Sequence, residues 1–395
     1  MSELSYLEKL LDGVEVEWKT LEDITLRTSN IKWREVIRSY RYIDLTSVDI
    51  ATKKITETTE ITKNNAPSRA QKLVDENDVI FATTRPTQQR FCLIDSEYAG
   101  EVASTGYCIL RAKQDQVLPK WILHWISTSD FKKHVEENQS GSAYPAISDS
   151  KVKECLIPIP CPDNPEKSLT IQSEIVRILD KFTALTAELT AELNMRKKQY
   201  NYYRDQLLSF KEGEVEWKTL GEVAQFKRGT AITQKQTTPG EIPVVANGPI
   251  PTYFHSESNR QGETIVIARS GAYAGYVSFW DQPIFLTDAF SVHSDLKIVK
   301  PKFIYHVLQN KQEHIHAMKK GAGVPHVRVK EFETYDIPIP PITEQERIVS
   351  ILDKFDTLTN SITEGLPREI ELRQKQYEYY RDLLFSFPKP ETVSN

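Results

Sequence analysis

The pattern of apolar and polar residues is clearest between Ile171 and Phe210, where apolar side chains recur at steps of three and four. The positions are Ile171, Ile175, Leu179, Phe182, Leu185, Leu189 and Leu193, and the series resumes at Tyr200, Tyr203, Leu207 and Phe210. This spacing places one apolar stripe along a helix face. A helix of about 40 residues would be about 60 Å long, too long for one small core. The pattern therefore predicts a long helix with a partner helix.

The chain contains a second copy of this stretch, from about Thr343 to Phe387. ILDKF at 178–182 recurs at 351–355, and KQYNYYRDQLLSF, which ends at Phe210, recurs as KQYEYYRDLLFSF, which ends at Phe387. An internal repeat this close is the strongest organising feature of the sequence. The second copy is therefore the candidate partner helix.

The two copies differ in the middle. TAELTAEL at 186–193 contains a four-residue unit twice, and each added unit would lengthen the helix by about 6 Å. The second copy lacks this unit and carries Gly365 and Pro367, which should kink or interrupt the helix. The tyrosines of both copies indicate coiled-coil packing, and a face for docking a partner is a compatible second interpretation.

A second set of repeats precedes each helix. VEWKTL begins at Val16 and again at Val215, DVIFATTRP parallels ETIVIARSG, and LPKWILHWIST parallels KPKFIYHVLQN. GSAYPAISDSKVKE parallels GAGVPHVRVKEFE. Each block ends in IPIP, which we interpret as an extended connector between the globular part and the next helix. We expect an α+β fold in which two similar globular domains are joined by two long helices forming an antiparallel coiled coil, with an internal pseudo-two-fold repeat. The expected boundaries are 1–160 for the first domain with a short N-terminal helical tail, 161–212 for the first helix, 213–341 for the second domain and 342–390 for the second helix.

Composition is that of an ordinary soluble protein. The chain has 395 residues, of which 39% are apolar and 27% charged, so that two or three domains are expected. No run approaches the 18 or so apolar residues of a membrane span, and the acidic start lacks the features of a signal peptide. The four cysteines, Cys92, Cys108, Cys155 and Cys161, form no C-x-x-C pair. We expect a cytoplasmic protein with reduced thiols.

The net charge of -5 is unusual for a nucleic-acid binder, but its distribution matters more than its sum. Residues 19–160 hold 20 Lys and Arg against 19 Asp and Glu, and residues 221–341 hold 13 against 11. The negative excess therefore lies in the helices and termini. Weakly positive domains permit DNA binding without requiring it.

No catalytic motif is present. The sequence has no phosphate-binding G-x-x-x-x-G-K-[ST] and no G-x-G-x-x-G. Glu313, His314 and His316 could suggest a metal, but a solvated helix face is the favoured interpretation. We therefore expect no catalytic residue and no metal site.

Candidate DNA contacts in the first domain lie in two polar segments and beside a proline. Arginine suits bidentate contact with guanine and glutamine suits adenine, so TTRPTQQR fits the reading of base edges, and a polar hairpin loop is the alternative. PSRAQK could contact phosphates, and Tyr144 beside Pro145 could be a contact or a core residue. The candidates are Thr84, Arg85, Gln88, Gln89 and Arg90 for bases, Ser68, Arg69 and Lys72 for phosphates, and Tyr144.

The second domain has matching candidates. The turn ARSGAYAG follows the strand that parallels DVIFA, and its glycines permit a close approach of the backbone. VVANG, FKRG and PHVRVK extend the set. The candidates are Lys227, Arg228, Asn247, Arg269, Ser270, Tyr273, His326, Arg328 and Lys330, each of which could instead be plain surface.

This combination of two variable blocks, IPIP connectors and repeated helices resembles the specificity (S) subunit of type I restriction–modification systems. The resemblance covers nearly the whole chain, and the TAEL repeat followed by KQYNYYRDQLLSF resembles the type IC subgroup. Such a subunit has no catalytic activity of its own and binds no cofactor directly.

The resemblance implies partners and a division of labour. The chain would bind double-stranded DNA and position two methyltransferase (M) subunits, which carry S-adenosylmethionine and methylate adenine N6. Two motor-nuclease (R) subunits would use ATP and magnesium. Each globular domain would be a target-recognition domain for one half of a bipartite site. The number of TAEL units would set the unread spacer, two units giving the shorter form.

Two other classes of function remain open at this point. A coiled-coil scaffold whose two lobes bind proteins or carbohydrate would have the same repeats, and a steep salt dependence of DNA binding would distinguish the two. An enzyme with an unrecognised site is the third possibility.

Overall fold

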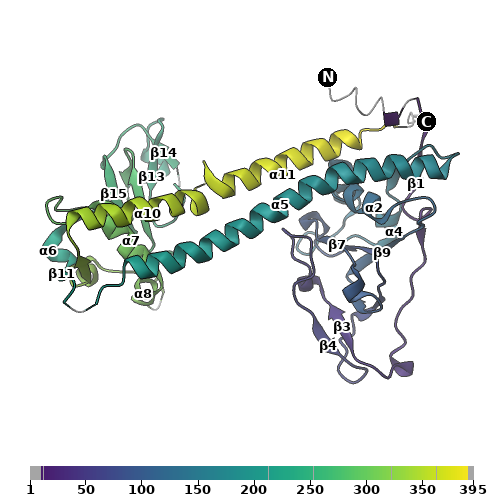
Figure 1. Cartoon of the computed structure of the whole chain (residues 1–395), viewed down its shortest axis with the longest axis horizontal. Coiled ribbons are helices and arrows are strands. Elements are labelled where there is room, and N and C mark those ends of the chain that lie inside the picture. Colours follow the sequence, from purple (N-terminus) through teal and green to yellow (C-terminus); the bar gives the residue numbers. More distant parts are fainter. Residues whose placement is uncertain are drawn as a thin grey trace. The chain divides into compact units, whose positions relative to one another are not determined.

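The computed structural model describes residues 10–11, 13–211, 213–251, 253–321, 323–361 and 363–389. The N-terminal helical tail expected before residue 13 lies almost entirely outside these residues. The chain forms two compact units, each described by itself (Figure 1). The first unit contains residues 1–189 together with 370–395, and the second contains residues 190–369. Each unit therefore combines a globular domain with parts of both helical repeats.

The globular domain of the first unit has two four-stranded sheets and a separate two-stranded ribbon. One sheet has the order β2-β9-β6-β7, and the other has the order β4-β3-β8-β5. The strands are β1 (Val16–Thr20), β2 (Thr25–Leu26), β3 (Tyr40–Ile43), β4 (Thr59–Ile61), β5 (Ala70–Leu73), β6 (Val79–Ala82), β7 (Phe91–Leu93), β8 (Val102–Ser104), β9 (Tyr107–Ala112) and β10 (Leu156–Pro160). The helices are α2 (Pro119–Trp125), α3 (Ser129–Asn138) and α4 (Asp149–Lys153), with short 3-10 helices η1 (Trp33–Glu35), η2 (Leu45–Ser47), η3 (Pro86–Gln88) and η4 (Ser96–Tyr98).

The globular domain of the second unit repeats this plan. Its larger sheet has the order β12-β18-β15-β16, and its smaller sheet has the order β14-β13-β17. The strands are β11 (Glu216–Thr219), β12 (Ala224–Arg228), β13 (Ile242–Val245), β14 (Tyr253–His255), β15 (Glu263–Ala268), β16 (Val277–Asp281), β17 (Phe285–Leu286), β18 (Ala289–Ser294) and β19 (Asp336–Ile339). The helices are α6 (Leu220–Val223), η5 (Gln234–Gln236), α7 (Pro301–Asn310), α8 (Gln312–Ala317) and α9 (Val329–Glu333).

The two domains share their topology, which confirms the predicted duplication. β2, β9, β6 and β7 follow one another across the first sheet as β12, β18, β15 and β16 do across the second. Each smaller sheet contains one parallel pair, β3 with β8 and β13 with β17. The predicted amphipathic segments form α2 and α7, and each begins at a proline, whose fixed φ suits the first helical turn.

The repeated VEWKT and IPIP motifs pair with each other. β1 lies antiparallel to β10, with Trp18 opposite Pro158, and β11 lies antiparallel to β19, with Trp217 opposite Pro338. Proline cannot donate to a ladder, so it fits a two-stranded ribbon where an edge is free. The IPIP segments are extended as predicted, but they also close the domains by pairing with their first strands.

The first helical repeat is one continuous helix, α5 (Pro165–Leu207), of 43 residues. The second is divided into α10 (Ile342–Asn360) and α11 (Gly365–Leu384), so the predicted interruption is confirmed. Gly365 has a φ of +78°, and a Cβ at this position would lie 2.4 Å from the carbonyl oxygen of Thr357. Glycine is therefore required where the chain changes direction.

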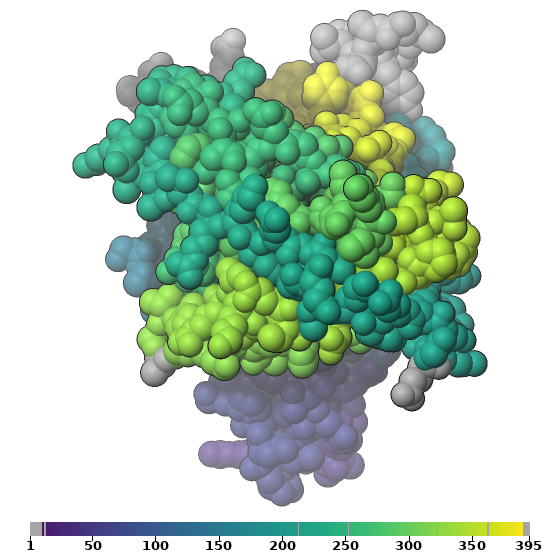
Figure 2. Space-filling view, turned by 90° about the vertical axis from the view of Figure 1, so that its left-hand side faces the viewer, coloured from purple at the N-terminus to yellow at the C-terminus, as the bar shows by residue number. Residues whose placement is uncertain are grey.

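Each unit pairs a different part of α5 with a different helix. In the first unit α11 lies antiparallel to the first half of α5, and the rings of Phe182 and Tyr380 stack at 5.4 Å (Figure 1). In the second unit α10 lies antiparallel to the second half of α5, where the ring of Tyr200 stacks on that of Phe355 at 6.1 Å. Figure 2 shows the teal end of α5 beside the yellow-green α10 on the surface of the second unit. The predicted coiled-coil packing is confirmed.

The tyrosines of the repeated KQYxYYRD motif divide into packed and exposed residues. The first tyrosine packs in both copies: Tyr200 is buried, and Tyr377 contacts the core of the first unit. The second is exposed, with 61% of Tyr202 and 56% of Tyr379 accessible. The packing interpretation therefore holds for the first tyrosine, and the second tyrosine of each copy lies at the surface.

A histidine–aspartate contact joins each domain to the helix that follows it. His124 Nε2 lies 2.9 Å from Asp180 Oδ1, and His306 Nε2 lies 2.9 Å from Asp353 Oδ1. A lysine on the same helix as each histidine also bonds the aspartate. Partial burial alone would raise the pKa of both carboxyls, but these hydrogen bonds and charges outweigh it and lower the pKa. Both contacts therefore favour the ionised aspartate.

The two copies of this contact differ at the other ring nitrogen. His124 Nδ1 lies 2.9 Å from the hydroxyl of Tyr377, which also contacts Ser127 Oγ at 3.1 Å. His306 Nδ1 is buried without a hydrogen-bond partner. Both ring nitrogens of His124 therefore have hydrogen-bond partners, whereas only Nε2 of His306 has one.

This difference yields a matched test of stability. Tyr377→Phe should destabilise the first unit by about 1–3 kcal/mol, because it leaves the buried Nδ1 of His124 without a partner. Tyr200→Phe is the control, since His306 Nδ1 already has none, and it should cost less. Hydrogen exchange of the α2 and α7 amides measures both effects separately. An equal loss of protection in the two helices would contradict the assignment.

Candidate nucleic-acid interface

In each domain two distant loops meet at one end of the larger sheet. In the first domain the amide of Arg85 donates to the carbonyl of Pro145 at 2.7 Å, and that of Ile147 donates to Thr83 at 2.9 Å. In the second domain the amide of Gly271 donates to Pro325 at 2.9 Å. Isolated bridges join Thr84 to Ala146 and Ser270 to His326. The two candidate segments of each domain therefore form one surface.

The first-domain loop holds two residues in left-handed backbone conformations. Arg85 has a φ of +49° and Gln89 a φ of +54°, on either side of η3, which begins at Pro86. Each such conformation costs about 1–3 kcal/mol for a residue other than glycine and is often found at functional sites. The guanidinium of Arg85 lies 5.2 Å from the centroid of the Tyr144 ring, which is 71% exposed. The loop thus presents an arginine–tyrosine pair to solvent.

Other first-domain candidates divide into exposed and internally bonded side chains. Arg90 donates to the carbonyl of Leu45, and Lys72 donates to Asp149 and to the carbonyl of Tyr107. These bonds favour structural roles for the two cations. The exposed candidates are Ser68, Arg69 and Gln88.

Gln89 faces inward. Its carbonyl accepts from Lys53, and its Nε2 is buried without a partner. Burial lowers the pKa of Lys53 to about 8. The side chain of Gln89 is therefore less accessible to DNA than that of Gln88.

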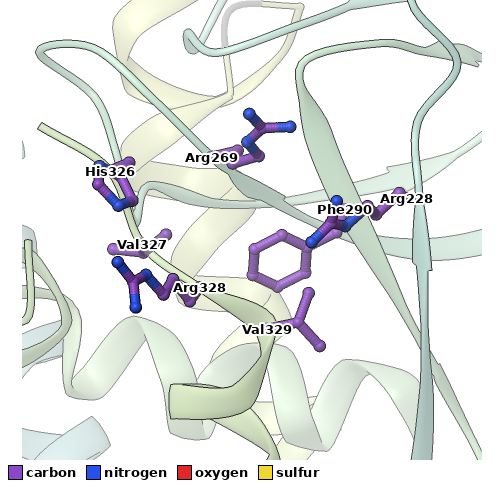
Figure 3. Close-up of a pocket in the computed structure, with 7 residues that line it drawn as sticks. All are labelled: Arg228, Arg269, Phe290, His326, Val327, Arg328 and Val329. Carbon is purple, nitrogen blue, oxygen red and sulfur yellow. The ribbon is translucent and has the colours of Figure 1, made fainter. Parts of the chain in front are cut away.

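The second-domain candidates form a pocket. A cavity of about 220 Å³ is lined by four cationic or titratable side chains and three apolar ones (Figure 3). They are Arg228, Arg269, His326 and Arg328, with Phe290, Val327 and Val329. These residues come from β12, the turn after β15, β18, the segment before α9 and the first residue of α9. All four polar members are among the candidates predicted from the sequence, but no motif in the sequence places them together.

Acidic groups near this pocket are already engaged. Asp288 lies 3.8 Å from Arg269 Nε and accepts from the hydroxyl of Ser270. Glu331 lies 2.7 Å from Lys320 Nζ. Partial burial alone would raise the pKa of Glu331, but hydrogen bonds from Lys320 and from the amide of Arg328, with their charges, lower it. Among the residues that the structure describes, the guanidinium groups of Arg228 and Arg328 form no ion pair.

Arg260 supports the pocket and was not predicted. Its Nη2 donates to the carbonyl of Arg228 at 2.8 Å, and its Nε donates to Ser291 Oγ at 2.7 Å. Burial lowers its pKa. A Cβ at Gly229 would lie 2.0 Å from the carbonyl oxygen of Thr287, so the turn after Arg228 passes close to the sheet. No motif marks Arg260 in the sequence, because its partners are more than 30 positions away.

The remaining second-domain candidates lie around the same turn. A Cβ at Gly271 would lie 3.2 Å from Asn247 Nδ2, which places the VVANG loop against this turn. Tyr273 is half-exposed, Lys227 is exposed at the end of β12, and Lys330 is exposed on α9. The structure thus brings most of the predicted set to one end of the domain.

The histidines considered for a metal have other neighbours. His314 contacts the ring of Tyr335, and His316 Nδ1 lies 3.1 Å from the carbonyl of Ala274. Within the described part of the chain, no group of three or more His, Cys, Asp or Glu could hold a metal ion. No helix in that part is long and apolar enough to cross a membrane. The four cysteines are free thiols, as expected.

A family model described as the type I restriction modification DNA specificity domain matches residues 15–196 and 212–372. The two matches include more than half of the chain, and the chain therefore belongs to this family. It is 45% identical to the EcoR124I/EcoR124II type I restriction enzyme specificity subunit of Escherichia coli, over the full length of both chains. It is 36% identical to the EcoprrI specificity subunit of Escherichia coli, over 92% of this chain and 93% of the relative.

Solved structures show the same fold. The S subunit of a type I restriction–modification system from M. genitalium has a TM-score of 0.64 at 18% identity, over 96% of this chain and 98% of that one. A chain from a study of complex assembly in a type I R-M system has a TM-score of 0.59 at 21% identity, over 94% and 97%. Both likenesses extend across two domains and the long helices.

Two variants of Arg85 separate DNA contact from backbone strain. Arg85→Gly and Arg85→Ala both remove the guanidinium and should weaken binding of specific DNA equally, by about 1–3 kcal/mol if it contacts a base. Only glycine relieves the left-handed conformation, so Arg85→Gly should be more stable than Arg85→Ala by about 1 kcal/mol. Urea unfolding and DNA titration measure the two effects. Unchanged DNA binding in both variants would remove Arg85 from the interface.

Proposed function

We propose that the chain reads an asymmetric bipartite DNA site, with one half-site contacted by each globular domain. The observation that carries this proposal is the common surface formed after β6 and after β15. The same backbone bonds build it in both domains, while Thr83 stands where the second domain has Arg269 and Ala146 where it has His326. A shared frame with different side chains suits two readers of different sequences.

The helical repeats act as the spacer between the two half-sites. α5, with 43 residues, is about 65 Å long and contains both TAEL units. Its repeats and its tyrosine motif support membership of the type IC subgroup, in which the number of TAEL units sets the unread gap. Because α10 and α11 are interrupted at Gly365 and α5 is not, α5 is the element whose length sets the gap.

The chain also assembles catalytic partners. Two M subunits would supply S-adenosylmethionine and methylate adenine N6, and two R subunits would use ATP and magnesium. Tyr202 and Tyr379 support this part of the proposal, because they are exposed at equivalent positions in the two repeats. Two equivalent surfaces fit two copies of one partner. A reader of cellular DNA in such a complex acts in the cytoplasm.

The direct test is a methylation map. The chain is expressed with its M subunit in a host without other adenine methylation, and methylated adenines are located across the genome. One split motif with two different halves and a fixed gap is the expected result, because the two interfaces differ. A continuous palindrome, or no methylation by a correctly assembled complex, would refute the proposal. The scaffold alternative predicts no sequence preference.

Deleting residues 186–189 tests the spacer role of α5. The helix loses one TAEL unit and about 6 Å, so the gap should shorten while both half-sites stay the same. The matched control replaces these four residues by alanines, which keeps the helix and its length. Methylation mapping of both variants gives the gap. Altered half-sites in the deletion, or a shorter gap in the control, would contradict the spacer role.

A further inference from the structure

The pocket of the second domain presents mostly hydrogen-bond donors at its polar positions, since His326 alone among them can also accept. Arginine carries five N–H donors and no acceptor, and three of the four polar lining side chains are Arg228, Arg269 and Arg328. Figure 3 shows these side chains and His326 grouped around the ring of Phe290. Such a pocket complements a group that has only acceptors. On DNA the candidates are the O6 and N7 edge of guanine and the phosphate oxygens.

The backbone that carries these arginines is held in place by the surrounding chain. Arg260 fixes the backbone of Arg228 through its carbonyl, and Asp288 links Arg269 to Ser270. The amide of Val327 donates to the carbonyl of Arg269 at 3.0 Å, which joins the two loops next to Arg328. A backbone fixed at these points limits where the arginine side chains can reach, which favours recognition of a defined base edge.

The floor of the pocket is rigid. Phe290 and Val327 are buried beneath it, and Phe290 is fixed by edge-to-face contacts with Phe226 and Phe332. A base edge can therefore meet the pocket only at its exposed arginines, Arg228 and Arg328.

The matching place in the first domain has different chemistry. Comparison of the strand pairing and bridges of the two domains gives the equivalent positions. Cys108 is equivalent to Phe290, Thr83 to Arg269 and Ala146 to His326. Nearby, Lys72 is bonded to Asp149, and Arg85 lies over the exposed ring of Tyr144. The three arginines that line the second-domain pocket are therefore not repeated at the equivalent positions of the first domain.

We propose that the second domain reads a guanine in its half-site, and that Arg228 and Arg328 are specificity-determining residues that bind its O6 and N7. The proposal rests on the proposed function, because it requires the second domain to contact one half-site. Arg260 is a positioning residue, which acts through the backbone of Arg228.

The experiment uses the chain assembled with its M subunit and a duplex that contains the mapped site. Arg328→Ala should weaken binding roughly 5- to 150-fold and relax methylation at one guanine position in one half-site. The half-site altered by Arg85→Ala should be the other one. Lys297→Ala removes an exposed positive charge outside the pocket and should leave the motif unchanged.

Two modified duplexes separate a base contact from a phosphate contact. 7-Deazaguanine at the relaxed position lacks N7, so it should weaken binding by the unmodified protein and have no further effect on Arg328→Ala. A neutral methylphosphonate at the neighbouring phosphate should weaken both proteins alike. The opposite pattern, or a uniform loss on all sequences with a smaller salt slope, assigns the pocket to phosphate and overturns the proposal.

The outcomes also distinguish this inference from the function on which it rests. A split methylation motif whose second half is unchanged in Arg328→Ala and Arg228→Ala overturns only the guanine assignment. Arg260→Gln should relax the same position as Arg228→Ala, because it frees the backbone of Arg228. Arg260→Lys, which keeps the charge but cannot reach both carbonyl and hydroxyl, should not restore it.

Discussion

The structure of the first unit depends on the packing of the C-terminal end of α11 against α2. The rings of Trp121 and Phe385 lie 4.5 Å apart, and Trp18 Nε1 donates to the carbonyl of Pro388 at 2.7 Å across 370 positions of sequence. The first core is therefore completed by the last described segment of the chain. The second unit is made of one continuous stretch, residues 190–369. The boundaries of the two compact units therefore do not coincide with the boundaries of the sequence repeats.

The two parts of each helical repeat pack in different units, and this follows from the position of the apolar residues in each copy. The first part of a copy carries the ILDKF aspartate, which binds the histidine of the domain just before it. The second part carries the tyrosine motif, which packs in the other unit. Because each unit receives one part from each copy, changes at the packed positions of either helical repeat affect both units. Residues 186–193 lie between the packed positions Phe182 and Tyr200, so the length of this segment can change separately.

Periodicity predicted the elements well, because it records which faces are buried. The helix of α5, the break at Gly365 and the hairpin loop around Arg85 are all local properties of spacing, glycine and proline. The pairing of VEWKT with IPIP was not predicted. A proline-rich segment resembles a connector when its partner strand is about 140 positions away, as in the first domain, or about 120, as in the second. Composition also failed to separate Arg90, which is bonded to Leu45, from Arg85, which is exposed.

The same distinction explains how a chain with a net charge of -5 can recognise DNA. Affinity for an acceptor depends on cations that have no internal partner, and these cannot be counted from a sequence. Lys72, Arg90, Arg111 and Arg260 are all bonded within the protein. Arg228 and Arg328 line a shared pocket and form no ion pair among the described residues, which makes them candidates for recognition. Composition counts them in the same way as the bonded arginines, so net charge alone does not predict whether a chain can bind DNA.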